Sequence, residues 1–271
     1  MPAIGLICPN NDKMTWNACL KKTCPNCLCM PVRKAIYKTH QKTHSFPTVT
    51  SLLYCPKKAK LEYTQDYYIY PRQAYYAMRG SLIHEILSNN SEKDEIIEQE
   101  FERLVPNTDF ILKGKIDRVY KNVLYDYKTM ENNGIYSILK NGHKKENIWQ
   151  INIYKWLIEN TIKIKEIKII YLSMSGQYIS GESFPLKSKS QSVTMITLPA
   201  VPIYSNEKIE AYIISKMKRI QDRDIPQANA SNAWLCDWCA FKDSCHADIA
   251  KTNINITPSI PLKNDIDNLL K

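Results

Sequence analysis

The residues best suited to chemistry lie near the middle of the chain, in residues 114–128. This stretch predicts two short strands joined by a tight turn at Lys121 and Asn122. Side chains alternate between the two faces of a strand, so Asp126 and Lys128 share one face, and the hairpin can bring Asp117 alongside them. Two acids and an amine buried together without partners would cost several kcal/mol per charge. A divalent cation that prefers oxygen ligands, such as magnesium or manganese, would offset much of that cost.

Lys128 would then remain free to orient or deprotonate a water molecule. The same Asp-x-Lys triplet also fits a plain ion pair on a solvated hairpin, so the rest of the chain must decide between the two interpretations.

Two helices are expected to flank this hairpin. Residues 71–89 carry apolar residues at helical spacing and include His84, with Gly80 one turn before it. A glycine in mid-helix costs roughly 1 kcal/mol against alanine, which favours a close approach by another backbone or a ligand. A second helix has an apolar stripe that includes Trp149 and Trp156. It places Gln150 and Tyr154, four residues apart, on another edge.

The 9 cysteines are unevenly distributed. Three lie close together near the C-terminus as Cys236-x-x-Cys239-x5-Cys245, and Cys55 is isolated in the sequence. Three thiols that bind one centre need a fourth ligand, for which Cys55 is available and His246 is an alternative. Four thiolates suit zinc or an iron–sulfur cluster, and the spacing alone does not separate them.

The other cysteines lie in the first 29 residues. A four-thiolate zinc site is expected from Cys8, Cys19, Cys24 and one of Cys27 or Cys29, because so small a module needs a metal to fold. The alternatives are a two-Cys-two-His site from Cys24, Cys27, His40 and His44, or reduced free thiols.

The charge and hydropathy of the chain indicate what kind of partner it binds and whether it crosses a membrane. The net charge of +10 and the sequence pI of about 9.0 indicate a polyanionic partner, most simply nucleic acid. No apolar run approaches the ~18–20 residues that span a bilayer, and the N-terminus lacks the pattern of a signal peptide, so a cytoplasmic location without membrane association is expected.

The remaining pattern predicts an α/β protein. Strands are expected near residues 101–105, 167–173 and 193–198, and helices over residues 33–42 and 206–223. A short helix should start at a Thr50 or Ser51 cap and be disturbed by Pro56, and residues 131–147 suggest a polar loop or frayed helix. Three parts are expected: a Cys-rich module over residues 1–46, a main domain over 47–250 and a polar tail over 251–271.

Six motifs occur in one order along the chain. They are Cys55, Gly80-x-x-x-His84, Gly114-x-x-Asp117, Asp126-x-Lys128, Gln150-x-x-x-Tyr154 and Cys236-x-x-Cys239-x5-Cys245. In this order and spacing the chain resembles the RecB-like iron–sulfur branch of the PD-(D/E)xK nuclease superfamily, which includes CRISPR-associated RecB-like exonucleases and AddB-type nucleases. The resemblance covers roughly residues 47–246; the Cys-rich N-terminus resembles only an extension of some bacterial and phage relatives.

The resemblance implies a role for each motif. His84, Asp117 and Asp126 would hold magnesium or manganese, Lys128 would position and activate the attacking water, and Gln150 and Tyr154 would orient the site or the DNA backbone. A structural 4Fe–4S cluster would be bound by four thiolates: Cys55, Cys236, Cys239 and Cys245. It also implies a restriction-endonuclease-like core, a mixed central sheet flanked by helices and closed by the cluster region. Asp126 occupies a position where many members have glutamate, which is an accepted variant.

The expected activity is metal-dependent hydrolysis of DNA phosphodiesters, as an exonuclease that prefers single strands or ends. Two alternatives stay open. One is a nuclease-fold assembly partner in CRISPR spacer acquisition or recombination, with protein partners in those processes. The other is a non-catalytic module that binds zinc and nucleic acid.

Overall fold

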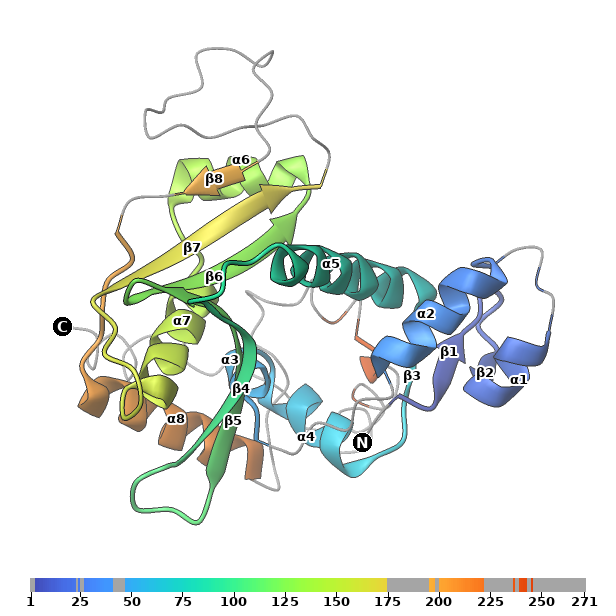
Figure 1. The fold of residues 1–271 in the computed structure, drawn as a ribbon. Helices are drawn as coiled ribbons and strands as arrows, with labels where there is room; N and C mark the ends of the chain where they lie inside the picture. The colour runs from blue at the N-terminus through green and yellow to red at the C-terminus, as the bar shows by residue number, and fades with distance from the viewer. Residues whose placement is uncertain are drawn as a thin grey trace.

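The computed structural model describes residues 3–22, 24, 27–40, 47–174, 195–197, 200–221, 236, 239–242 and 245. These residues form two β-sheets with helices around them (Figure 1). In chain order the elements are β1 (Gly5–Ile7), β2 (Lys13–Thr15), α1 (Trp16–Lys21), α2 (Met30–His40), α3 (Val49–Leu53), α4 (Pro56–Thr64), β3 (Tyr68–Ile69), α5 (Pro71–Asn89), β4 (Ile96–Leu104), β5 (Ile111–Tyr120), β6 (Val123–Met130), α6 (Asn132–Asn141), α7 (Lys145–Ile158), β7 (Glu166–Ser173), β8 (Met195–Thr197) and α8 (Asn206–Gln221).

The larger sheet is mixed, with strand order β4-β5-β6-β7-β8. Neighbouring strands pair antiparallel except β6 and β7, which are parallel and are connected through α6 and α7. Helix α7 is buried along most of its length, and the ring of Trp149 stacks on Tyr212 of α8 with centroids 3.8 Å apart. A mixed sheet flanked by helices is the expected class and is consistent with a restriction-endonuclease-like core.

The predicted hairpin is confirmed. Strands β5 and β6 pair antiparallel, and the two residues between them, Lys121 and Asn122, have φ of 48° and 66°. Two consecutive residues with positive φ match the twist of the flanking strands and make a tight two-residue connection. This register brings the motif residues of both strands to one part of the sheet.

Helix α5 has the predicted bounds, and Pro71 occupies its first turn, where a missing N–H costs nothing. It bridges the larger sheet and the smaller one (Figure 1). The expected core face of this helix is largely wrong: Met78 is buried, but Tyr75, Leu82 and Ile86, which share its helical spacing, are exposed. Of the side chains of α5 only Ala74 and Met78 are buried.

The smaller sheet has the order β2-β1-β3, and β1 is parallel to β3. Its core contains residues from the Cys-rich N-terminus, including Trp16 and Ile36, together with Ala74 and Met78 of α5. The described part of residues 1–46 therefore shares a sheet and a core with residues that follow it. A boundary at residue 46 remains a prediction.

Local details differ from the sequence expectations near α3 and α4. Thr48, and not Thr50 or Ser51, caps α3, and the side chains and backbones of Thr48 and Ser51 form a reciprocal capping box. Pro56 begins α4 rather than disturbing a helix, because proline is well tolerated in a first helical turn.

Other boundaries also shift. The stretch expected to be a polar loop or frayed helix contains the regular helix α6, and the strand expected near residues 101–105 begins earlier, at Ile96. The predicted helix over residues 33–42 is present as α2, which begins at Met30 and ends at His40. Strand β8 and helix α8 fall within the ranges predicted for them. The last residues of both predicted ranges lie outside the described residues.

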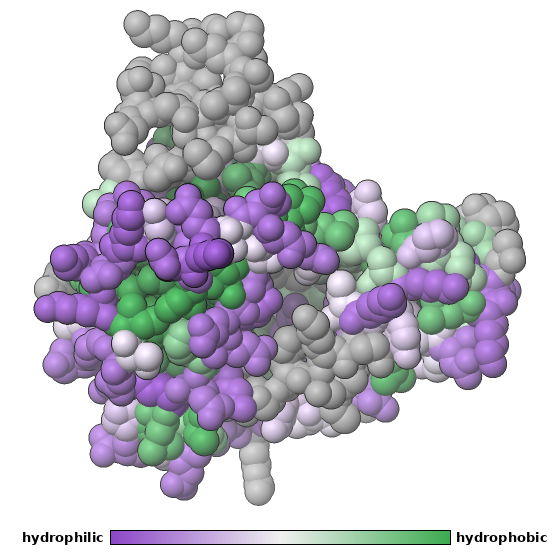
Figure 2. All heavy atoms as spheres, viewed as in Figure 1, coloured by the Kyte–Doolittle hydropathy of each residue, from purple (hydrophilic) through white to green (hydrophobic). Residues whose placement is uncertain are grey.

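In the face shown in Figure 2, hydrophilic side chains cover most of the described surface, with apolar patches between them. Within the described residues, no helix combines the length and the apolar character needed to cross a membrane.

Gly114 lies where β5 meets α3 and α7. A Cβ atom at this position would be 2.7 Å from Leu157 Cδ1, 2.8 Å from Val49 Cγ2 and 2.9 Å from Tyr154 Cε1. Gly114→Ala should therefore lower the free energy of unfolding by about 1–3 kcal/mol, as overpacking of a core does. Urea unfolding measures the change.

Gly80→Ala is the matched control. Its Cβ would meet only Thr129 Oγ1, at an ordinary 3.5 Å, and alanine gains up to about 1 kcal/mol over glycine within a helix. If both variants unfold at the same urea concentration, the crowding at Gly114 has no energetic effect.

Candidate active site

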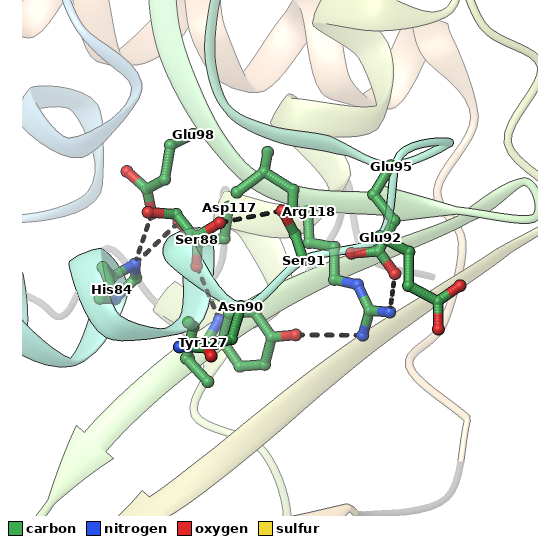
Figure 3. Close-up of a pocket in the computed structure, with 12 residues that line it drawn as sticks. His84, Ser88, Asn90, Ser91, Glu92, Glu95, Glu98, Asp117, Arg118 and Tyr127 are labelled. Carbon is green, nitrogen blue, oxygen red and sulfur yellow. Dashed lines mark hydrogen bonds and ion pairs between the residues drawn. The ribbon is translucent and has the colours of Figure 1, made fainter.

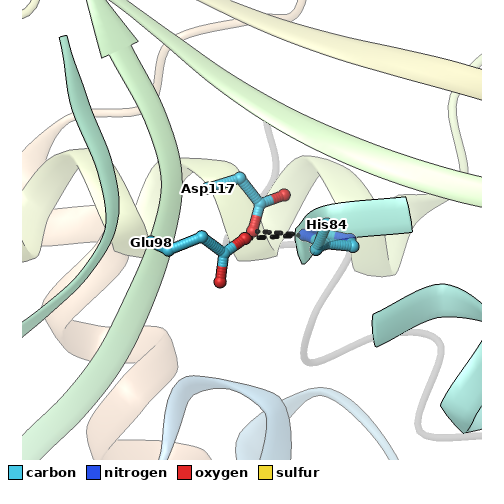
Figure 4. A group of neighbouring side chains, drawn as sticks. All are labelled: His84, Glu98 and Asp117. Atoms are coloured by element: carbon cyan, nitrogen blue, oxygen red, sulfur yellow. Dashed lines mark hydrogen bonds and ion pairs between the residues drawn. The ribbon is translucent and has the colours of Figure 1, made fainter. Parts of the chain in front are cut away.

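Three side chains from three elements converge at one end of α5. His84 comes from α5, Glu98 from β4 and Asp117 from β5, and Figure 4 shows their polar atoms facing one another. His84 Nδ1 lies 3.0 Å from Glu98 Oε1 and 3.5 Å from Asp117 Oδ1. One ligand atom from each of the three residues lies within 4.8 Å of the other two. Among the described residues, no other set of three histidine, cysteine, aspartate or glutamate side chains meets this spacing. One nitrogen and two oxygens at this spacing can bind a single divalent cation.

Glu98 was not identified from the sequence. It has φ of 49°, although it lies within a strand and is not glycine. The flanking residues keep the register, Ile97 with Arg118 and Gln99 with Ile116. Such backbone strain persists only where the surroundings enforce it, and it concentrates at functional sites. The glutamate lies in an acidic stretch with no motif around it, so the sequence offered no signal that would single it out.

Asp126 and Lys128 project from β6, as the alternation predicts. Lys128 Nζ donates a hydrogen bond to Asp126 Oδ1 at 2.9 Å and lies 2.8 Å from Oδ2. Asp126 is 1% exposed, so the Lys128 ammonium, which contacts both carboxylate oxygens, is the cation that offsets the cost of burying this charge.

Asp117 connects the two groups. Its Oδ2 accepts the backbone N–H of Tyr127 at 2.7 Å, which links it to β6. Burial raises the pKa of Asp117 to about 7, and the charge of Asp126 adds to the increase, while His84 and Lys128 oppose it. The site thus contains two buried acids whose mutual repulsion favours binding of a positive charge.

Lys128 is held as an ammonium. Burial acts to lower its pKa, but the charges of Asp126 and Asp117 outweigh burial and raise it. A lysine with a raised pKa is a source of positive charge rather than a proton acceptor at neutral pH. Its geometry favours the positioning of an oxygen or a developing negative charge over deprotonation of water.

The residues around His84 change its pKa. Its hydrogen bond to Glu98 is the largest influence and raises the pKa of His84 against the effect of burial. Glu98 also forms an ion pair with Lys115, and the pKa of Glu98 is lowered by its two partners although burial opposes the change. A metal ligated by His84 must displace the ring proton, so metal binding here is coupled to proton release.

Gln150 and Tyr154 lie on the buried face of α7. Gln150 Nε2 donates to the Tyr154 hydroxyl at 3.0 Å. Burial raises the pKa of Tyr154, and the charges of Asp126 and Asp117 raise it further, which places this hydroxyl in the electric field of the acids. The structure thus brings this pair near the acidic site, while its role stays a prediction.

A pocket of about 180 Å³ opens beside the group (Figure 3). Its walls include His84, Glu98 and Asp117, so three of the polar side chains reach a solvent-accessible space. On another wall, Arg118 forms an ion pair with Glu95, and one of its nitrogens lies 3.4 Å from the Tyr127 hydroxyl. Asp126 and Lys128 do not line this pocket.

The cysteines form two separate groups. Burial raises the pKa of the Cys239 and Cys245 thiols, and the thiols of Cys55 and Cys236 add to each increase. The charge of Cys55 therefore acts on Cys239 and Cys245, despite its distance from them in the sequence. His246, the alternative fourth ligand, lies outside the described residues.

In the N-terminal group, Cys19 is buried, Cys29 is exposed, and the remaining three are partly exposed: Cys8, Cys24 and Cys27. His44, part of the alternative Cys/His set, lies outside the described residues.

Comparison with known proteins agrees with this geometry. The family model described as the PD-(D/E)XK nuclease superfamily matches residues 89–246, more than half of the chain. This range includes Glu98, Asp117, Asp126 and Lys128 and begins after His84. The crystal structure of SSO0001 is similar in fold, with a TM-score of 0.53 and 17% identity over 80% of this chain and 94% of that one. No curated protein matches the chain.

Asp117→Asn should stabilise the metal-free protein above pH 7. A carboxyl whose pKa is raised on folding destabilises the fold fully above the raised pKa of about 7; the penalty decreases as pH falls below 7 and is gone only below the ordinary pKa of 3.8. Asparagine keeps an oxygen for the Tyr127 N–H and removes the charge. In EDTA the melting temperature of the variant should exceed that of the parent by a few degrees at pH 8. The difference should shrink toward pH 5; an equal difference at both pH values would contradict this account.

Proposed function

The chain belongs to the PD-(D/E)XK nuclease superfamily, and we propose that it is a divalent-metal-dependent deoxyribonuclease of the RecB-like iron–sulfur branch, acting as an exonuclease on single strands or ends. The observation that carries this proposal is the convergence of His84, Glu98 and Asp117 within 4.8 Å, next to the Asp126–Lys128 pair.

The residues present fit a divalent cation. His84, Glu98 and Asp117 would hold it, and Asp126, whose oxygens contact Lys128, would be a further oxygen donor on the neighbouring strand. The chemistry such an ion supplies is Lewis-acid polarisation of a phosphoryl oxygen and a lower pKa for a bound water. An imidazole among carboxylates favours manganese as well as magnesium.

Lys128 contributes a fixed positive charge. Its contact with Asp126 orients the ammonium, and the surrounding buried acids keep it protonated. Negative charge that develops on the phosphate during hydrolysis would be stabilised by an ammonium already in place, because no reorganisation is needed at that moment. Gln150 and Tyr154 would hold the acidic site in position from the α7 side.

Helix α5 supports a preference for single strands. Tyr75 and Tyr76 are 38% and 44% exposed, and the guanidinium of Arg79 lies 5.9 and 5.5 Å from their ring centres. Exposed aromatic rings with adjacent cations can stack on unpaired bases and contact phosphates. The net charge of +10 would add sequence-independent affinity for DNA.

The proximity of the four thiols supports a 4Fe–4S cluster. Cys55, at the N-terminus of α4, would be joined to Cys236, Cys239 and Cys245. Such a link would fasten the C-terminal segment to α4, which also packs against α8. The cluster would serve stability more than electron transfer.

Lys128→Ala and Glu98→Gln should separate catalysis from metal binding. At saturating manganese, Lys128→Ala should lower the single-turnover rate of DNA cleavage on the order of a hundredfold while metal affinity stays near normal. Glu98→Gln should chiefly raise the manganese concentration needed for half-maximal activity, because one ligand charge is lost. Calorimetric titration of manganese gives the affinities independently of activity.

Equal rates for Lys128→Ala and the parent, with metal saturating in both, would show that the hairpin is not the active site. Lys168→Ala is the control: this lysine lies on β7 and its ion pair is with Glu166, on the same strand. The control should cleave at the parental rate.

The second test concerns iron. Anaerobically purified protein should be brown and contain about four irons per chain, and Cys55→Ala should lose the colour and the iron. A Cys55→Ala variant that keeps all its iron would show that Cys55 is not a ligand. Cys29→Ala, an exposed cysteine of the other group, should leave the iron content unchanged.

A further inference from the structure

Arg33 is a buried cation among thiols. It lies on α2 and is 2% exposed, although arginine is almost never fully buried without a partner. One terminal nitrogen donates to the Cys19 backbone oxygen and lies 3.6 Å from Cys19 Sγ, and Nε has no hydrogen-bond partner. Burial lowers the pKa of Arg33, but its hydrogen bond to Cys19 and the nearby thiols of Cys19, Cys24 and Cys27 outweigh burial and raise it. A buried guanidinium requires an anion close to it to offset the cost of burial.

The four candidate thiols come from different parts of the chain around the smaller sheet. Cys8 follows β1 at a tight turn, where its N–H donates to Asp12 O at 2.8 Å. Cys19 lies on α1, and Cys24 and Cys27 lie between α1 and α2. Burial raises the pKa of the Cys8 thiol, and the thiols of Cys19, Cys27 and Cys24 raise it further. Cys29 is exposed and does not belong to this set.

We propose that Cys8, Cys19, Cys24 and Cys27 bind one zinc ion as thiolates and that Arg33 is the buried counter-charge of this centre. Four thiolates around Zn²⁺ leave two net negative charges, which supplies the anion that the guanidinium lacks. Arg33 is then a positioning residue, because it contacts the ligand Cys19 and not the metal. This inference does not depend on the proposed nuclease activity.

Zinc would also complete the local structure. These four sulfur atoms do not form a described group with ligand atoms within 4.8 Å of one another, so zinc binding would draw the thiols closer together. A small core such as this one, built on Trp16, Ile36 and a short sheet, gains stability from a structural metal.

The test is metal analysis and zinc affinity of the full chain. Purified protein should contain one zinc per chain in addition to iron, and Cys24→Ser should lose it. Arg33→Gln keeps all four ligands and should weaken zinc binding about 10- to 100-fold in competition with a chelating dye, the scale for loss of an outer partner of a ligand. Cys29→Ser should match the parent, and an unchanged far-ultraviolet circular dichroism spectrum shows that each variant is folded.

Three results would overturn the proposal. They are absence of zinc from protein produced with ample zinc, equal zinc loss in Cys29→Ser and Cys24→Ser, and parental zinc affinity in Arg33→Gln. Loss of zinc in His40→Ala together with retention in Cys8→Ser would instead establish the Cys/His set. If a cysteine variant does not fold, the Arg33→Gln affinity still decides, because that variant leaves every thiol in place.

Discussion

Two acids placed side by side inside a sheet are the constraint on which the rest of this structure depends. Asp117 and Asp126 lie on neighbouring strands, with Asp126 almost wholly shielded from water. The surrounding elements provide positive charge or donors to them: His84 from α5, Lys128 from β6 and the Tyr127 backbone. These partners reduce the repulsion between the two carboxylates without removing it. The repulsion that remains favours binding of a cation at the site.

Much of this arrangement could be read from the sequence because it depends on local periodicity. The turn at Lys121 and Asn122 fixes the register of β5 and β6, and strict alternation then determines the face of Asp126 and Lys128. The apolar stripes of α5 and α7 likewise identify helices with His84, Gln150 and Tyr154 on them. Gly114 could be recognised as part of a motif, but only the packing of Val49, Tyr154 and Leu157 shows why no side chain fits there.

What the sequence did not reveal depends on contacts between distant segments or on backbone conformation. Glu98 has a positive φ and lies 3.0 Å from His84, and no residue pattern in the sequence marks a strained glutamate in a strand. The pairing of β1 with β3 joins residues more than sixty positions apart, which a reading of local motifs cannot detect. Arg33 has no sequence feature that separates it from other basic residues of a helix, and only its burial beside Cys19 does so.

The parallel pairing of β6 with β7 also has a consequence for synthesis of the protein. Strand β6 carries Asp126 and Lys128, but its second edge is covered only after α6, α7 and β7 have been made, through Ser173. Parallel pairing closes a long loop and therefore forms slowly. While the chain emerges from the ribosome, the acids of β5 and β6 would lack the neighbours that bury them. The order of translation thus keeps a polypeptide that could cut nucleic acid incomplete until most of it has left the ribosome.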